Sequence, residues 1–156
     1  MNTFIQIETL ILTKEIKITI LISTYNKSVF IKKTLQSCLN QNYKNYEIIV
    51  VDTGSNDGTV KKLKDYSKFD KIKIKYINRK FKNSSVLNQI CAIETGLSIS
   101  KGEIICLLDG DDRFKENKLK EINNFFLKQK NVSFVQDIIK PSKNLNSYKE
   151  LKRYFL

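Results

Sequence analysis

Short runs of β-branched apolar residues alternate along the chain with segments of helical periodicity. The runs at 16–23, 46–51 and 103–108 have the composition of strands buried on both faces, and 72–77 alternates as a half-exposed strand does. Parallel strands need a crossover connection, and helices usually supply it. The order therefore predicts an α/β fold of Rossmann-like type, with a mostly parallel sheet and helices on both faces.

Helices are predicted in the intervening segments, since apolar residues recur there every three or four positions. The first is expected to begin at Ser28, whose hydroxyl can cap it. A short fifth strand is expected at 132–136, and Ser147 with Glu150 offers a capping box for a final helix. The four earlier helical segments are 28–39, 59–67, 86–98 and 115–129.

Polar clusters follow directly after three of the apolar strands. They are Ser23–Asn26, Asp52–Asp57 and Asp109–Asp112. The carboxyl ends of parallel strands lie at one edge of a sheet, and ligands of open α/β sheets bind there. Scattered solvated loops would not need carboxylates and amides at corresponding ends of three strands. The recurrence therefore indicates a binding site.

The Asp109–Asp112 cluster places three carboxylates within four residues. Such charges repel one another unless water or a cation neutralises them. Oxygen ligands suit Mg²⁺ or Mn²⁺, which bind through one or two carboxylates together with substrate phosphates. Gly110 would let the backbone approach a phosphate closely. The alternative is a solvated turn in which Asp112 caps the following helix.

The other two clusters each allow a ligand-binding and a structural interpretation. Asp52 could accept hydrogen bonds from a base or a ribose, with the backbone of Gly54 and Ser55 facing the ligand. The same residues also form good turns. Tyr25 could offer an aromatic face to a nucleobase beside Asn26. For Tyr25 alone, packing against the sheet edge is the better interpretation.

Composition excludes several kinds of chemistry. The 156 residues include no histidine, which excludes histidine triads, histidine-ligated zinc and histidine general bases. Acid–base or metal chemistry must therefore come mainly from carboxylates. Cys38, Cys91 and Cys106 are far apart and lie among apolar residues, which predicts buried free thiols in a reducing compartment.

Basic residues give the chain a formal net charge of +12. This excess could serve an anionic partner, but the lysines are spread along the chain as on an ordinary solvated surface. No nucleic-acid-binding motif is recognisable, so no nucleic-acid partner is expected. The apolar residues of 1–16 are interrupted by charges well short of the ~20 needed to span a bilayer, and they do not form a convincing signal peptide.

The ordered combination of motifs resembles family 2 glycosyltransferases of the GT-A fold. Residues 23–60, STYNKSVFIKKTLQSCLNQNYKNYEIIVVDTGSNDGTV, are similar to the opening of that family. Residues 100–114, SKGEIICLLDGDDRF, are similar to its Gly-Glu-hydrophobic strand and its Asp-x-Asp motif. The resemblance covers about residues 16–136. It implies binding of a nucleotide diphospho-sugar, with a UDP-sugar favoured, and inverting transfer to an acceptor hydroxyl on a glycan or a lipid-linked molecule.

The resemblance also implies roles for individual residues. Asp111 would hold Mg²⁺ or Mn²⁺ on the diphosphate, with Asp112 just behind the metal, and Asp109 would face the ribose. The catalytic base is not assigned. The remaining donor-binding residues would be Ser23 and Tyr25, which line the nucleobase pocket, together with Asn26, Asp52 and Ser55.

The chain departs from the family pattern at three positions. Ser23 stands where proline is common, and Thr53 replaces the second acid of an Asp-Asp pair that often reads the base. Leu87 occupies the position of an arginine. The basic residues that could supply this charge instead are Arg79, Lys80 and Lys82.

Three segments are expected: an N-terminal extension at 1–15, a GT-A-like nucleotide-sugar-binding domain at 16–139, and a C-terminal tail with a short helix at 140–156. The family's catalytic base lies beyond the Asp-x-Asp strand, so a sheet truncated on its C-terminal side is expected. An exposed sheet edge makes self-association a hypothesis. The expected location is the cytoplasm, with peripheral contact to the inner face of the membrane through lysines and residues 154–156 as a further hypothesis.

Three other functional classes compete with a transferase, and one of them, a basic RNA-binding domain, lacks a recognisable binding motif. The other two are as follows. One is a non-catalytic module, or a truncated remnant without the catalytic base, that binds the donor and transfers nothing. The other is a Mg²⁺-dependent phosphoryl-transfer protein with a nucleophilic aspartate. That second class would leave the Tyr-Asn and Asp-Thr-Gly-Ser clusters unexplained.

Overall fold

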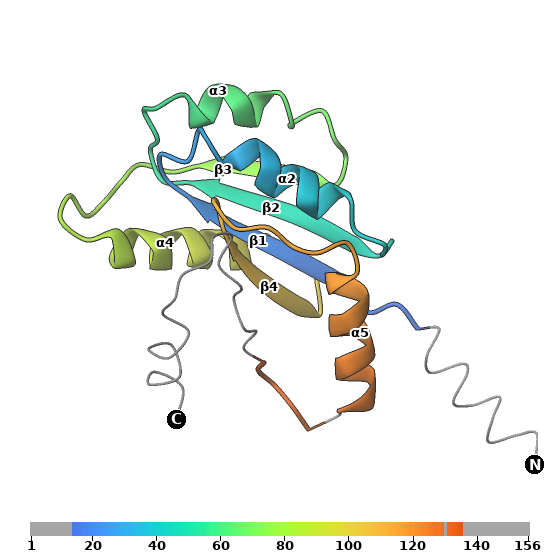
Figure 1. Cartoon of the computed structure of the whole chain (residues 1–156). Coiled ribbons are helices and arrows are strands. Elements are labelled where there is room, and N and C mark those ends of the chain that lie inside the picture. Colours follow the sequence, from blue (N-terminus) through green and yellow to red (C-terminus); the bar gives the residue numbers. More distant parts are fainter. Residues whose placement is uncertain (1–13, 130, 136–156) are drawn as a thin grey trace, which may run out of the picture.

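Four parallel strands form the centre of the computed structural model, which describes residues 14–129 and 131–135 (Figure 1). The order of the strands in the sheet is β3-β2-β1-β4, so β1 and β2 are central. The expected parallel α/β architecture is confirmed. The strands are β1 (Ile18–Thr24), β2 (Tyr46–Asp52), β3 (Ile72–Tyr76) and β4 (Ile104–Asp109).

Helices cover both faces of the sheet, as expected (Figure 1). Ile20 and Ile22 of β1 belong to a core that includes residues of three helices, and Leu21 packs with Ala92 of the fourth in a separate core. Successive strand residues point to opposite faces, so the two cores lie on the two sides of the sheet. The helices of the first core are α2 (Ile31–Leu39), α3 (Thr59–Lys64) and α5 (Lys118–Lys128), and that of the second is α4 (Ser85–Leu97).

The helix α2 begins later than its sequence suggests. Ser28 does not cap it; the helix starts at Ile31, and the residue at its N-cap position, Phe30, makes no side-chain capping bond. The backbone N–H of Ser28 donates instead to Asp57 (2.9 Å). The prediction of a Ser28 cap was wrong because Ser28 lies within the turn that precedes the helix, where the carbonyl of Lys27 accepts from the backbone N–H groups of Phe30 and Ile31.

The strand expected at 132–136 is absent from the described residues of that segment, 132–135. Phe134 is 78% exposed and Val135 47%. Alternating apolar residues form a strand only where one face is buried, and these side chains have no such support. The expected helix at 147–156 lies outside the described residues. Within 14–129 and 131–135, no helix is both long and apolar enough to cross a bilayer.

The three cysteines are free thiols, and Cys38 and Cys106 are buried while Cys91 is half-buried. This confirms that they form no disulfide frame. Burial raises the pKa of Cys38 to about 12 and that of Cys106 to about 11. Both buried thiols are therefore protonated and unreactive at neutral pH.

Glu47 joins several segments at the amino-terminal edge of the sheet. Its carboxylate accepts hydrogen bonds from the Thr19 hydroxyl (3.0 Å) and the Lys101 backbone N–H (2.6 Å), and it forms an ion pair with Nζ of Lys73 (2.6 Å). Burial by itself would raise the pKa of Glu47, but these three donors outweigh it and lower the pKa. Glu47 therefore ties β1, β3 and the loop before β4 to β2.

We expect Glu47→Gln to lower the free energy of unfolding by about 1–2 kcal/mol at pH 7, because the ion pair with Lys73 is lost. A lowered carboxylate pKa stabilises the fold above the ordinary value of 4.5, and this contribution disappears as the pH falls through the folded-state value. Urea unfolding between pH 7 and pH 3 should therefore show the two proteins converging in acid. Glu94→Gln, on the exposed surface of α4, is the control, and a difference independent of pH would contradict the assignment.

Candidate functional site

The carboxyl ends of β1, β2 and β4 bring the three polar clusters side by side. Ser23 is in register with Asp109 of β4, and Thr24 is in register with Asp52 of β2. In the sheet, β2 lies on one side of β1 and β4 lies on the other side, and the helices α2 and α4 lie on opposite faces (Figure 1). This is a topological switch point, where open α/β sheets bind ligands.

Two hydrogen bonds join the tip of β1 to the loop after β2. The backbone N–H of Asn26 donates to Oγ of Ser55 (2.8 Å), and Oδ1 of Asn26 accepts from the backbone N–H of Asn56 (2.9 Å). Asn26 has a φ of 50°, in the left-handed region that asparagine tolerates better than most residues. The two hydrogen bonds between Asn26 and residues 55 and 56 fix the tip of β1 relative to the loop after β2.

Asp52 is buried, with 1% of its surface exposed, and its carboxylate is used within its own loop. Oδ1 accepts from the backbone N–H groups of Gly54 (3.1 Å) and Ser55 (2.9 Å), and Oδ2 accepts from the Ser55 hydroxyl (2.5 Å). Gly54 has a φ of 85°, which favours glycine. The turn-forming interpretation of Asp52 therefore describes its contacts here, and its place beside a nucleobase stays a prediction.

Tyr25 lies against Arg79, whose guanidinium carbon is 4.1 Å from the centre of the ring. Arg79 comes from the loop between β3 and α4. The same loop approaches Gly54, where a Cβ would lie 3.4 Å from the backbone nitrogen of Arg79. One of the three candidates for the missing arginine charge is thus placed at the tip of β1.

The loop that carries Arg79 is anchored by Asn88, which the sequence analysis did not single out. Asn88 is buried on α4; its Oδ1 accepts from the backbone N–H groups of Lys80 and Phe81, and its Nδ2 donates to the carbonyls of Phe81 and Ser84. An asparagine among apolar helical positions is the signal that could have identified it.

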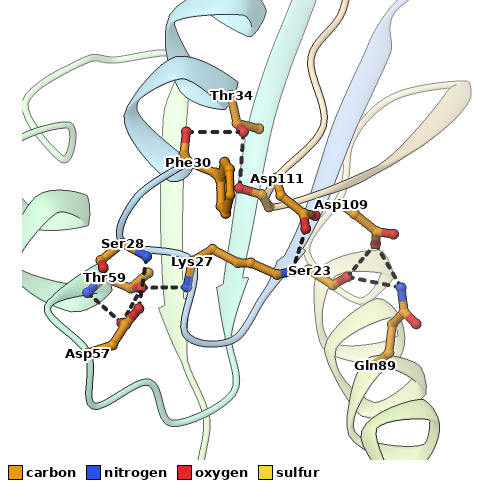
Figure 2. Close-up of polar contacts among 11 residues, drawn as sticks. Ser23, Lys27, Ser28, Phe30, Thr34, Asp57, Thr59, Gln89, Asp109 and Asp111 are labelled. Atoms are coloured by element: carbon orange, nitrogen blue, oxygen red, sulfur yellow. Dashed lines mark hydrogen bonds and ion pairs between the residues drawn. The ribbon is translucent and has the colours of Figure 1, made fainter. Parts of the chain in front are cut away.

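Residues from β1 and α4 hold the Asp109–Asp112 cluster (Figure 2). Oδ1 of Asp109 accepts from Nε2 of Gln89 (2.8 Å) and from the Ser23 hydroxyl (3.4 Å). Oδ2 of Asp111 forms an ion pair with Nζ of Lys27 (2.5 Å). Sequence reasoning missed both Lys27 and Gln89. Lys27 directly follows the polar cluster of β1, which is a usable signal, whereas nothing in the sequence marks Gln89.

Asp112 does not cap α5, because the helix begins at Lys118 with Asn117 at its N-cap position. Its backbone N–H donates to the carbonyl of Asp109 (3.0 Å) and closes a turn. Burial raises the pKa of Asp112, the charges of Asp111 and Asp109 raise it further, and Lys27 opposes them. The repulsion expected among three adjacent carboxylates is therefore present and is partly offset by a lysine.

Asp57 fixes the segment that carries Lys27 (Figure 2). Its carboxylate accepts from the backbone N–H of Ser28 (2.9 Å) and from the backbone N–H (3.0 Å) and hydroxyl (2.6 Å) of Thr59. The Thr59 hydroxyl in turn accepts from the backbone N–H of Lys27 (2.8 Å). Burial alone would raise the pKa of Asp57, but these hydrogen bonds lower it well below its ordinary value.

The carboxylates of the Asp109–Asp112 cluster fit a metal ion that is bound jointly by the protein and a substrate better than a metal ion that is bound by the protein alone. Among the residues that the structure describes, no group of three or more Asp, Glu, His or Cys side chains is placed to hold a metal. Asp111 is 36% exposed and offers one accessible carboxylate. Mg²⁺ and Mn²⁺ accept such a site when substrate phosphates and water complete their coordination.

The fold and the position of these clusters define the class of the protein: an α/β domain of the GT-A type, with the Asp-x-Asp segment at the switch point. Residues 19–156 match the family described as "Glycosyl transferase family 2", and the chain belongs to this family.

A relative agrees with this family assignment, and solved structures agree with the fold. The chain is 32% identical over 113 residues to the poly(ribitol-phosphate) beta-N-acetylglucosaminyltransferase TarP of Staphylococcus aureus, covering 70% of this chain and 32% of TarP. It matches S. aureus TarS 1-349 in complex with UDP at a TM-score of 0.62 and 23% identity, covering 73% of this chain and 33% of that one. The mannosyltransferase PcManGT from Pyrobaculum calidifontis, in complex with GDP-Man and Mn²⁺, matches at a TM-score of 0.61 and 22% identity, covering 76% and 33%. The chain thus spans about a third of the length of each of these proteins.

We expect Asp57→Ala to lower the free energy of unfolding by about 1 kcal/mol, because exposure reduces the value of its charged hydrogen bonds. The backbone around Lys27 should loosen, and amide hydrogen exchange at residues 27–31 should accelerate. Asp65→Ala removes an equally exposed carboxylate, whose contact with Lys32 is long (3.7 Å), and serves as the control. Unchanged exchange at 27–31 would contradict the role given to Asp57.

Proposed function

We propose that the chain carries the donor site of a glycosyltransferase that moves a sugar from a nucleotide diphospho-sugar to an acceptor hydroxyl. The observation that carries the proposal is the meeting of Ser23, Asp109 and Asp111 at the switch point beside β1. Family membership supports it, as do the UDP and GDP-Man complexes of proteins with this fold. A UDP-sugar is the favoured donor.

The base would lie at the tips of β1 and β2, and the ribose would lie toward the tip of β4. Ser23 and Tyr25 would line the base, and the stacked Arg79 would give the Tyr25 ring a fixed orientation. Asn26 and Ser55 would shape the pocket through their mutual hydrogen bond, with Asp52 holding the loop beneath them. These contacts would hold the loops in place before the donor arrives, which would reduce the entropic cost of binding.

Asp109 would accept hydrogen bonds from the ribose hydroxyls. Its carboxylate is exposed, and Gln89 and Ser23 orient it from two sides through Oδ1. The Asp109 carboxylate accepts hydrogen bonds, the Gln89 amide nitrogen donates them, and the Ser23 hydroxyl can do both. This combination suits a sugar hydroxyl, which can also both donate and accept.

Asp111 would hold Mg²⁺ or Mn²⁺ on the diphosphate, with Asp112 just behind it. Such a cation neutralises the charge that develops on the leaving nucleoside diphosphate as the bond to the sugar breaks. The exposure of Asp111 and the presence of Mn²⁺ in the PcManGT complex support this role. Direct inversion would further require a carboxylate to take the proton of the acceptor hydroxyl, and that base is not assigned.

The acceptor is proposed to be a glycan or a lipid-linked molecule, and no nucleic acid is involved. We propose a cytoplasmic location that allows contact with the inner face of the membrane. Self-association at β4 is also proposed, because β4 is an edge strand of the described sheet and its Leu107 is 55% exposed.

A non-catalytic donor-binding module is the second candidate. Three of the described carboxylates of the site already have partners: Asp52 its loop, Asp109 the Gln89 amide and Asp111 the Lys27 ammonium. Such groups suit binding better than proton abstraction. Transfer of radiolabelled sugar to an acceptor, measured beside donor binding, separates the two functions.

We expect UDP-sugars to bind with higher affinity in the presence of Mn²⁺ than in its absence. Asp111→Ala should abolish this difference and weaken Mn²⁺-dependent binding by about 10-fold or more, because an Asp111 carboxylate on the metal is lost. Calorimetric titration of UDP, UDP-GlcNAc and GDP-mannose with and without Mn²⁺ measures this. Asp65→Ala is the matched control. Absence of nucleotide binding under every condition would overturn the proposed function.

A further inference from the structure

Lys27 is held in place by contacts that do not involve its charge. Its backbone N–H donates to the hydroxyl of buried Thr59, and its carbonyl accepts from the backbone N–H groups of Phe30 (3.0 Å) and Ile31 (2.9 Å). Its aliphatic stem passes Gly110, where a Cβ would lie 3.3 Å from Cγ of Lys27. The backbone hydrogen bonds of Lys27, together with the absence of a side chain at Gly110, therefore place the Lys27 ammonium at the tip of β4.

The ammonium meets the carboxylate to which the proposed function assigns a divalent cation. Figure 2 shows the Lys27 side chain extended toward Asp111, and the two side chains are 34% and 36% exposed. Lys27 is thus the cation that offsets the acidic cluster in this structure.

We propose that Lys27 is a positioning residue, the resident counter-ion of Asp111, and that it must leave this carboxylate before Asp111 can hold a divalent cation. The inference rests on the proposed function. In the absence of a diphosphate, the described residues offer no set of three ligands that would outweigh the loss of the ion pair. Divalent cations alone therefore bind weakly.

A bound diphosphate changes this balance. Its oxygens supply the ligands that the protein lacks, and they offer a new anionic partner to the freed ammonium. Lys27 therefore couples the two binding events, so that the divalent cation and the nucleotide each raise the affinity for the other by the same factor.

Lys27→Met tests this role, because methionine keeps much of the stem and removes the charge. Mn²⁺ binding without nucleotide, measured from the electron paramagnetic resonance signal of free Mn²⁺ at low ionic strength, should tighten by about fivefold, the upper range for an exposed ion pair. UDP should then raise the Mn²⁺ affinity by a smaller factor than it does in the wild type, because the Asp111 carboxylate of the variant is available to Mn²⁺ before UDP binds.

Matched variants separate the ion pair from other effects. Lys27→Arg keeps the charge and should bind Mn²⁺ as the wild type does. Lys61→Met removes one positive charge from an exposed position on α3 and should change Mn²⁺ affinity by less than about twofold. Lys27→Gln is a second neutral variant, and thermal unfolding verifies that each protein is folded.

Equal Mn²⁺ affinities in the wild type, Lys27→Met and Lys27→Gln would overturn the inference, and so would an increase of the same size in Lys61→Met. Undetectable Mn²⁺ binding in both neutral variants would also overturn it. Calorimetry with UDP reports separately on the proposed function. Loss of UDP binding in all proteins would reject the donor site, whereas the metal titration decides the role of Lys27 in either case.

Discussion

The register of β1 between β2 and β4 is the constraint on which the rest of the structure depends. Ile20 and Ile22 face one core and Leu21 the other, and all three are buried. A slip of one residue would send each of these side chains to the wrong face of the sheet. Burial on both faces therefore fixes the register, and the register in turn sets Ser23 beside Asp109.

Electrostatic compensation at the strand ends follows from this arrangement. Parallel strands bring carboxylates from separate loops to one edge, where their charges would repel. Each carboxylate accepts from donors in a different segment. Asp52 accepts from its own loop, Asp109 from α4 and β1, and Asp111 from Lys27. Each carboxylate of the acidic edge is therefore offset by a contact of its own, and two of the three contacts join segments far apart in the sequence.

Much of the fold was predictable, because β1, β2 and β4 are buried runs whose composition signals strands without knowledge of their partners. Their polar ends could also be expected to meet, since parallel topology requires it. The contacts between the tips were not predictable. Lys27 and Asp111 are 84 positions apart, and Gln89 reaches Asp109 only because α4 packs under β1. The strand expected at 132–136 was wrong for the same reason, because periodicity indicates which face of a strand could be buried and not which residues would cover it.

The contacts of Glu47 lie where the strands of the sheet begin, and the candidate site lies where the strands end, so the two ends of the sheet have different roles. At the edge where the strands begin, Glu47 holds the alignment through its contacts with Thr19 and Lys73. At the opposite edge, the loops are anchored to one another and to α4 by side-chain hydrogen bonds. Under the proposed function, the segments around Asn56 and Arg79 could therefore change to accept a different donor while the strands beneath them stay the same.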